Sequence, residues 1–217
     1  MNVLELFAGS RSIGKAAESL GMNVFSSDIN AFEDIDYVTD IREFDTKSVP
    51  FQPDVIWASP PCTYFSVASI GKHWNRDNTP KSDNALLGVE FVQKTIDIIK
   101  ELKPTYWFIE NPRGKLRKLD VMTTLDKQLS NQGFEYPYVM RHTVTYCKYG
   151  DSRMKPTDIW TNCPYWIPLP MCKNGDPCHV SAPRGSQTGT QGLKGNYERS
   201  KIPEELCLEV LKSTMVL

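Results

Sequence analysis

The cysteine at position 62 has the sequence context of a nucleophile. It directly follows Pro61 in a loop that begins where the apolar run 54–58 ends. Such a run predicts a buried strand, and the loop then places the thiol at the carboxyl edge of a sheet, where open α/β proteins hold their ligands. Proline fixes φ and stiffens this position. A thiolate there can attack an electron-poor carbon, although a cysteine packed in the core is the commoner case.

A carboxylate, Glu110, follows a second apolar run, residues 106–109. The large apolar residues before it favour partial desolvation, which raises the pKa of a carboxyl group and lets it hold a proton near neutrality. Because Cys62 and Glu110 both lie at predicted strand ends, we expect them to converge at one edge of the sheet.

Two basic residues, Arg153 and Lys155, stand two positions apart in a segment that reads as extended. Side chains at this spacing lie on one face of a strand. They would orient Glu110 or grip the polar edge of a base or a phosphate. A solvated surface pair is the alternative.

The first strand–turn–helix unit predicts a ligand site. An apolar run from Val3 ends at Gly9, and apolar residues at helical spacing follow. Backbone amides at a helix start favour an anionic group, and a single early glycine followed by Ser10 suits a carboxylate better than a pyrophosphate. Asp28, at the end of the next strand, would take a ribose hydroxyl pair, and Asp40 with Ile41 would flank an adenine. An ordinary tight turn is the alternative.

Strands and helices alternate up to about residue 135, which predicts an α/β fold with a mostly parallel, doubly wound sheet. Residues 138–147 and 157–160 flank a polar turn and predict an antiparallel pair at a sheet edge. Helices are expected at 87–102, capped by Ser82 or Asp83, at 121–129, and from about Pro203. We expect a core at 1–162, a small irregular lobe at 163–195, and a C-terminal segment at 196–217 that returns to the core.

Composition sets broad limits. With 217 residues, 40% apolar and 24% charged, the chain suits one globular core. We find no run near the roughly 20 apolar residues of a membrane span and no secretory signal. Six cysteines without dense spacing suit reduced thiols and a cytoplasmic protein. With a net charge of −1, any nucleic-acid contact must rest on local basic surface.

These segments, in this order, resemble the cytosine-specific DNA methyltransferases that modify the 5-carbon of the base. The segments that carry the resemblance are the cofactor turn Phe7-Ala8-Gly9, the nucleophile loop Pro61-Cys62 with Phe65-Ser66, the carboxylate segment Glu110-Asn111, Arg153 with Lys155 in place of an Arg-x-Arg element, and Gly195-Asn196 before the last helix. The sequence departs from the family at Ser10-Arg11-Ser12, Pro112 and Lys155, and its lobe at 163–195 is far shorter than the usual target-recognition domain.

The resemblance implies a class I methyltransferase fold, S-adenosylmethionine as cofactor, and a monomer that modifies double-stranded DNA, as in restriction-modification. It implies that the target cytosine is flipped into a pocket, that Cys62 attacks ring position 6, that Glu110 donates to ring nitrogen 3, and that Arg153 positions Glu110 and the base. The cofactor contacts that we expect are Phe7, Ala8, Gly9, Ser10, Asp28, Ile29, Asp40, Ile41, Pro61 and Asn196.

Two stretches carry a local surplus of basic residues, the loop after Cys62 and the segment 172–201. Such residues neutralise phosphates, although a solvated basic surface is the alternative. The nucleic-acid contacts that we expect are Ser66, Lys72, Arg76, Lys155, Arg184, Lys194 and Arg199.

The lobe also holds four residues that bind metals in other proteins, namely Cys163, Cys172, Cys178 and His179. A structural zinc would help a lobe too small to build its own core. Because the spacing is not a standard ligand pattern, we favour reduced thiols and no metal.

Other functions remain open. The acceptor could be an RNA cytosine, which the sequence does not separate from DNA. Methylation of an exocyclic amine is disfavoured because Cys62 stands where those enzymes carry an aromatic residue. A regulator that binds nucleic acid without catalysis has no need for Cys62, Glu110 and Arg153 together.

Overall fold

The computed structural model describes residues 1–130, 132–173, 175–181 and 195–216. Within them, seven strands form one sheet in the order β3-β2-β1-β4-β5-β7-β6. The strands are β1 (Asn2–Leu6), β2 (Asn23–Asp28), β3 (Tyr37–Val38), β4 (Val55–Ala58), β5 (Tyr106–Pro112), β6 (Met140–Thr145) and β7 (Pro156–Thr161).

The sheet is parallel from β3 to β5, whereas β7 runs antiparallel to both of its neighbours, β5 and β6. This confirms the predicted mixed sheet with an antiparallel pair. Only β6 of that pair is at the edge. The inner strand β7 is buried along nearly its whole length, while half of β6 is partly exposed, which is the difference expected between an interior strand and an edge strand.

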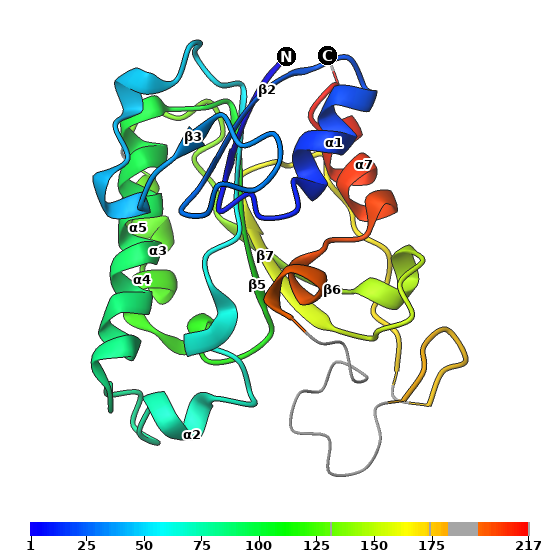
Figure 1. Cartoon of the computed structure of the whole chain (residues 1–217). Coiled ribbons are helices and arrows are strands. Elements are labelled where there is room, and N and C mark those ends of the chain that lie inside the picture. Colours follow the sequence, from blue (N-terminus) through cyan, green and yellow to red (C-terminus); the bar gives the residue numbers. More distant parts are fainter. Residues whose placement is uncertain (131, 174, 182–194, 217) are drawn as a thin grey trace.

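Helices cover both faces of the sheet (Figure 1), with α1 and α7 on one side and α3, α4 and α5 on the other. The helices are α1 (Ser12–Ser19), α2 (Ile70–His73), α3 (Asp83–Leu102), α4 (Asp120–Thr123), α5 (Leu125–Leu129), α6 (Asn196–Ser200) and α7 (Glu204–Ser213). Successive residues of β4 serve the two cores in turn: Val55 and Trp57 pack on the α1 side, and Ile56 and Ala58 on the α3 side.

The long helix α3 forms as the sequence predicts. Ser82 caps it, accepting a hydrogen bond from the amide of Ala85 at 3.3 Å, and Lys103 ends it in the left-handed conformation. The single helix expected at 121–129 is instead two short helices that meet at Thr124, which is not helical. The last helix begins after Pro203, as predicted.

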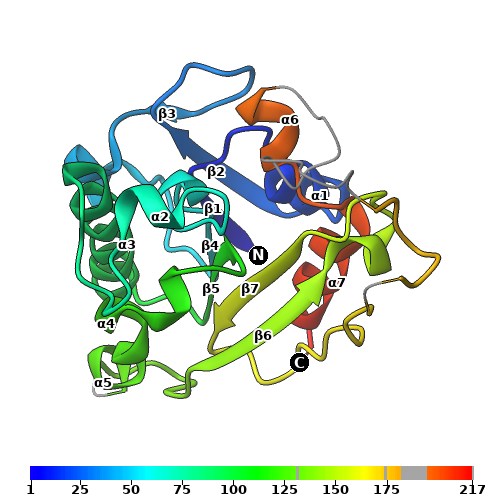
Figure 2. The same ribbon diagram turned by 90° about the horizontal axis from the view of Figure 1, so that it is seen from below.

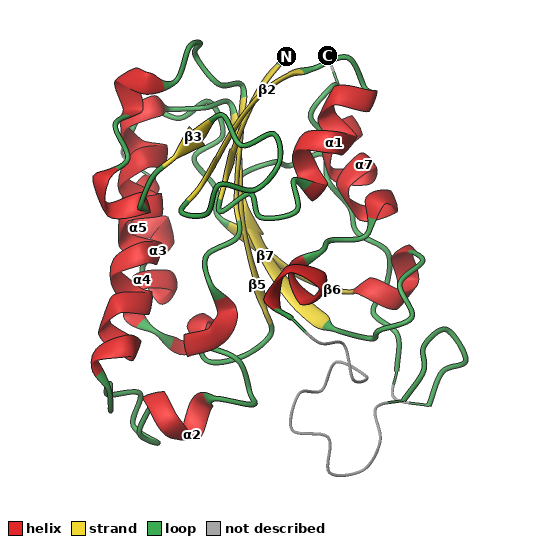
Figure 3. Cartoon of the chain, in the orientation of Figure 1, coloured by secondary structure: helices red, strands yellow, loops and turns green. Residues whose placement is uncertain are grey.

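The loops that carry the candidate site residues gather at one end of the sheet (Figure 3), where β1, β4 and β5 end. Seen from below in Figure 2, α2 and α6 lie at this end. Between Asn162 and Ser181 the described residues form neither helix nor strand. None of the helices in the described part of the chain has both the length and the apolar character that crossing a membrane requires.

Candidate active site

The loop that carries Cys62 is fastened to the segment that follows Glu110. The side-chain amide of Asn111 donates to the carbonyl oxygen of Pro60 at 2.9 Å, and the amide of Lys115 donates to the carbonyl oxygen of Phe65 at 2.8 Å. A Cβ on Gly114 would lie 2.3 Å from that same oxygen, so only glycine permits this approach. The ends of β4 and β5 are thereby held side by side.

Glu110 is buried, with 5% of its surface exposed. The hydroxyl of Tyr146 donates to its Oε1 at 2.9 Å. Burial raises the pKa of the Glu110 carboxyl, while the positive charge of Lys155 and the hydrogen bonds from Tyr146 and Ser59 act in the opposite direction. The result is a carboxyl group that favours its protonated form more than a free glutamate does.

Cys62 is accessible to solvent, yet protein atoms surround its thiol closely. This crowding raises the pKa of the thiol; the charge of Lys155 lowers it, and the charge of Glu110 raises it. Because β4 pairs with β5 and Asn111 contacts Pro60, Cys62 and Glu110 lie at the same edge of the sheet, where the sequence placed them. The charge of Lys155 acts on both groups.

Lys155 lies inside this site and not on an outer surface where nucleic-acid contact was expected. Its ammonium donates to the carbonyl oxygen of Arg199 at 3.2 Å and lies 4.5 Å from the centre of the Tyr146 ring. Burial lowers its pKa, and the charges of Glu110 and Cys62 raise it. The backbone of Lys155 has φ +29°, a strained value for a residue with a side chain, as often found at functional sites.

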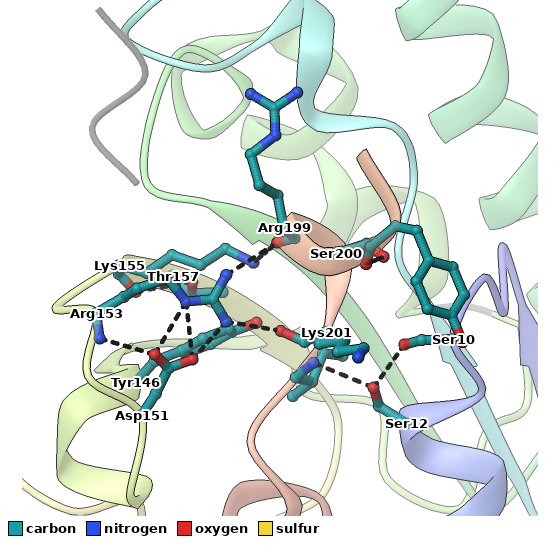
Figure 4. A network of polar contacts seen from close by, with 12 residues as sticks. Ser10, Ser12, Tyr146, Asp151, Arg153, Lys155, Thr157, Arg199, Ser200 and Lys201 are labelled. Carbon is teal, nitrogen blue, oxygen red and sulfur yellow. Dashed lines mark hydrogen bonds and ion pairs between the residues drawn. The ribbon is translucent and has the colours of Figure 1, made fainter. Parts of the chain in front are cut away.

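Arg153 differs from the expectation that it orients Glu110 directly. Its guanidinium is buried and grips Asp151 through Nε and Nη2, with Nε 2.9 Å from each carboxylate oxygen (Figure 4). It also donates to the carbonyl oxygens of Arg199 and Lys201, each at 3.3 Å. Its bidentate partner Asp151 lies in the turn before β7, and the two carbonyl oxygens belong to the end of α6 and the residue after it. Arg153 therefore connects the end of α6 to this turn.

The turn after β1 approaches both β2 and the C-terminal segment. The amide of Gly9 donates to Oδ2 of Asp28 at 3.0 Å, and Gly9 has φ +50°. The hydroxyls of Ser10 and Ser12 are hydrogen-bonded at 2.9 Å, and Ser12 accepts from the amide of Ile202 at 3.1 Å (Figure 4). Residues far apart in the chain therefore enclose one region beside Asp28.

The start of α1 is occupied by the protein's own carboxylate. Glu5 is buried and accepts hydrogen bonds from the amides of Ile13 at 3.1 Å and Gly14 at 3.0 Å, and burial raises its pKa to about 7. The helix start was expected to receive an anionic group of the ligand. This expectation needs correction, because Glu5 already satisfies these amides.

The other residues that we expected to contact the cofactor lie in several different local environments. Asp40 caps the short 3-10 helix Ile41–Glu43 and is bonded to the guanidinium of Arg42 at 2.7 and 3.1 Å. Ile41 is buried in the core, and Ile29 is exposed. Pro61 immediately precedes the short 3-10 helix Cys62–Tyr64. Asn196 is the first residue of α6, and its side chain is outside the described set.

The residues expected to contact nucleic acid are distributed around this end of the sheet. Lys72 and Arg76 are exposed in the segment after Cys62, and the hydroxyl of Ser66 is 2.9 Å from that of Ser69. Nε of Arg199 donates to the carbonyl oxygen of Gly195 at 3.2 Å. Arg184 and Lys194 lie outside the described residues.

The candidate metal ligands are only partly as expected. Cys172, Cys178 and His179 lie together, and their fourth neighbour is Cys147. Cys163 is elsewhere, with its sulfur 3.7 Å from the hydroxyl of Ser213 on α7. The chain direction explains this, because Cys163 lies two residues after β7 and packs against α7, whereas Cys147 lies two residues after β6.

Sequence reasoning missed Tyr146, Asn111 and Asp151 as working parts of the site. Tyr146 read as one apolar residue in a strand, and a buried hydroxyl gives no periodic signal. Asn111 was named only as part of the segment Glu110-Asn111, and no role of its own was expected. Asp151 could have been found from the sequence, because an acidic residue two positions before an arginine in a polar turn is well placed to pair with it.

Comparison with known proteins decides the family. Residues 1–151 match the family model of the C-5 cytosine-specific DNA methylase. The chain belongs to this family. It is also 30% identical to the "Probable DNA (cytosine-5)-methyltransferase" of Frog virus 3 (isolate Goorha), over 97% of this chain and 99% of the relative. As a member of the family, the chain is an S-adenosylmethionine-dependent DNA cytosine methyltransferase.

Solved structures support the fold of this DNA methylase family member. The Entamoeba histolytica methyltransferase EhMeth is 16% identical with a TM-score of 0.57, over 80% of this chain and 57% of that structure. A variant of DNMT2 from Spodoptera frugiperda is 18% identical with a TM-score of 0.51, over 79% of this chain and 53% of that structure. This chain thus spans little more than half the length of either structure.

Proposed function

We propose that this DNA methylase methylates carbon 5 of a cytosine flipped out of double-stranded DNA, through a covalent bond to Cys62, and that it acts as a monomer. The observation that carries the proposal is the coupling of one accessible thiol, one buried carboxyl and one buried ammonium, those of Cys62, Glu110 and Lys155. A site of this composition can add a sulfur to one side of a ring while it protonates the other.

Carbon 5 of cytosine is a poor nucleophile because it belongs to an aromatic ring. The sulfur of Cys62 adds to carbon 6, and the carboxyl of Glu110 gives its proton to nitrogen 3, so the displaced electrons collect at carbon 5. After the methyl group has joined carbon 5, that carbon loses its proton to a base. The bond from carbon 6 to sulfur then breaks, Cys62 leaves as a thiolate, nitrogen 3 returns its proton to Glu110, and the aromatic ring is restored.

The charges of the site favour these protonation states together. A protonated Glu110 no longer carries the negative charge that raises the pKa of Cys62. The ammonium of Lys155 lowers that pKa as well. The state in which Glu110 can donate is therefore also the state in which the thiol of Cys62 ionises most easily.

The residues around Asp28 fit S-adenosylmethionine, which supplies the methyl group when bound. The Asp28 carboxylate accepts from the amides of Gly9 and Asn30 and from the side chain of Asn30, which leaves it room for a hydroxyl donor. A Cβ on Gly9 would meet only Ser200 Oγ and Phe7 O, at 3.6 and 3.9 Å, so the bare backbone leaves room for a ligand. We assign binding to Asp28 and the turn Phe7–Ser10, with further contacts from Ile29, Ile41, Pro61 and Asn196.

The exposed basic residues Lys72 and Arg76 lie in the segment after Cys62, where they can meet the phosphates that flank a flipped base. Arg184, Lys194 and Arg199 are proposed to extend this contact. Ser66 lies four residues after Cys62, so it would approach the DNA strand near the flipped base.

The direct test is transfer of radiolabelled methyl groups to matched duplex DNA and RNA oligonucleotides, with bisulfite sequencing of the product. We expect label at carbon 5 of cytosine in DNA. Label found only in RNA would show that the acceptor is RNA and not DNA. Binding of DNA without any transfer would favour a non-catalytic regulator.

A further inference from the structure

Four side chains of the types that bind metals meet beside the turn that carries Asp151. Cys147 lies in the short 3-10 helix Tyr146–Tyr149 (η5), and the others are Cys172, Cys178 and His179. Their ligand atoms all lie within 4.8 Å of one another. They join two parts of the chain that are 25 residues apart in sequence.

These atoms lie about as close together as the ligands of one metal ion. The sulfur of Cys147 is 3.2 Å from that of Cys172 and 3.5 Å from that of Cys178. Nδ1 of His179 is 3.7 Å from the sulfur of Cys172 and 3.8 Å from that of Cys178. Around zinc, with bonds of about 2.3 Å to sulfur and 2.0 Å to nitrogen, neighbouring ligand atoms lie about 3.5–3.8 Å apart.

The position of the group explains why a metal would be needed. The described residues from Asn162 to Ser181 have neither helix nor strand, and Ile167, Leu169 and Val180 are exposed. Two backbone contacts attach this segment nearby: the amide of Cys172 donates to Thr145 Oγ1 at 3.0 Å, and the amide of Val180 to the carbonyl oxygen of Ser152 at 3.0 Å. None of the described residues between 173 and 181 is buried, so this part of the segment has no apolar core of its own.

We propose that Cys147, Cys172, Cys178 and His179 bind a structural zinc ion. On binding, the three thiols release their protons to solvent, and His179 coordinates through Nδ1 as the neutral imidazole, so the site carries a net charge of −1. Four protein ligands fill the tetrahedral shell and leave no open position, so the metal does not take part in the reaction. Its function is to fasten residues 172–180 to η5 and to the turn that carries Asp151 and Arg153.

The first test is the metal content of the full-length protein purified without chelator, measured by plasma mass spectrometry. We expect about one zinc per chain. Cys172→Ala and Cys178→Ala should each lose the metal, whereas Cys163→Ala, which changes a cysteine outside the group, should keep it. A wild-type protein free of zinc, or loss of zinc by Cys163→Ala alone, would overturn the proposal.

A second measurement starts from the wild-type protein. The chain reconstituted with Co²⁺ in place of zinc should show the intense visible absorption of a tetrahedral thiolate site, and His179→Ala should alter this spectrum. Chelation should lower the Tm of the wild type but not of Cys178→Ala. An octahedral cobalt spectrum, or a disulfide between Cys147 and Cys172 found by peptide mass spectrometry under native conditions, would rule out the metal site.

Discussion

The amide nitrogen of Asn111 donates a hydrogen bond of 2.9 Å to the carbonyl oxygen of Pro60. Asn111 directly follows Glu110, and Pro60 lies two residues before Cys62, so this single bond sets the strand that carries the carboxyl against the loop that carries the thiol. Asn111 is fully buried, which shields the bond from water.

Replacing Asn111 with alanine should loosen this connection. We expect the free energy of unfolding to fall by about 1–3 kcal/mol, because the carbonyl of Pro60 loses a buried partner. The value of kcat should fall more than the affinity for S-adenosylmethionine, since Asp28 lies at the end of a different strand. Denaturant unfolding and methyl-transfer kinetics measure both effects. Asn84→Ala, at an exposed position on α3, should change neither, and equal kinetics for the two variants would contradict the role of Asn111.

Glu110→Gln should lower kcat by about 10²–10⁴-fold, because the amide has a similar shape but no carboxyl proton to give. Binding of DNA and cofactor should persist. Single-turnover methyl transfer and equilibrium binding separate the two effects. The matched control is Glu90→Gln on the exposed surface of α3, for which turnover should equal that of the wild type. Near-normal turnover by Glu110→Gln would remove the proton donor from the mechanism.

Lys155→Met should move the whole pH–rate profile to higher pH. The charge of Lys155 lowers the pKa of both Cys62 and Glu110, so its loss raises both values. Cys62 then ionises only at higher pH and Glu110 keeps its proton to higher pH, so both limbs of the profile move in the same direction. Lys47→Met, at an exposed position outside the site, provides the control. A profile that stays in place or moves to lower pH would refute this coupling.

Tyr146→Phe should act on one limb more than on the other. Its hydroxyl donates to Glu110 and lowers the pKa of that carboxyl, so removing it should raise this pKa and move the limb that Glu110 governs to higher pH. Within the described part of the chain this hydroxyl makes no hydrogen bond to Cys62, so the limb that Cys62 governs should move less. The pH dependence of kcat under saturating substrate distinguishes this pattern from that of Lys155→Met. A profile in which neither limb moves to higher pH would contradict the assignment of Glu110 as the proton donor.

The sequence predicted the parts of this molecule that depend on local pattern. Apolar runs and helical spacing indicated the parallel sheet and helix α3, and strand ends indicated that Cys62 and Glu110 meet. The position of β7 between β5 and β6 follows from long-range pairing, which no local pattern reports. The same reason explains Cys147, whose partners are reached only after the chain has turned through β7.

Charge assignments were the less predictable part of the site. Nothing in the local pattern distinguishes the role of Arg153 from that of Lys155, since both are basic and two positions apart. In the fold, Asp151 neutralises Arg153, and Lys155 is left to act on Glu110 and Cys62. Likewise, Glu5 occupies the start of α1 because β1 points its side chain toward that helix, a relation that depends on packing.

The central claim is a covalent bond between Cys62 and carbon 6 of the target base. A duplex with 5-fluorocytosine at the target tests it most directly, because fluorine replaces the proton that must leave carbon 5 before sulfur is released. With S-adenosylmethionine present, we predict a denaturation-resistant protein–DNA adduct whose peptide mass spectrum maps to Cys62, and none with Cys62→Ser. The absence of an adduct in an enzyme that methylates the ordinary duplex, or an adduct that persists in Cys62→Ser, would contradict the mechanism.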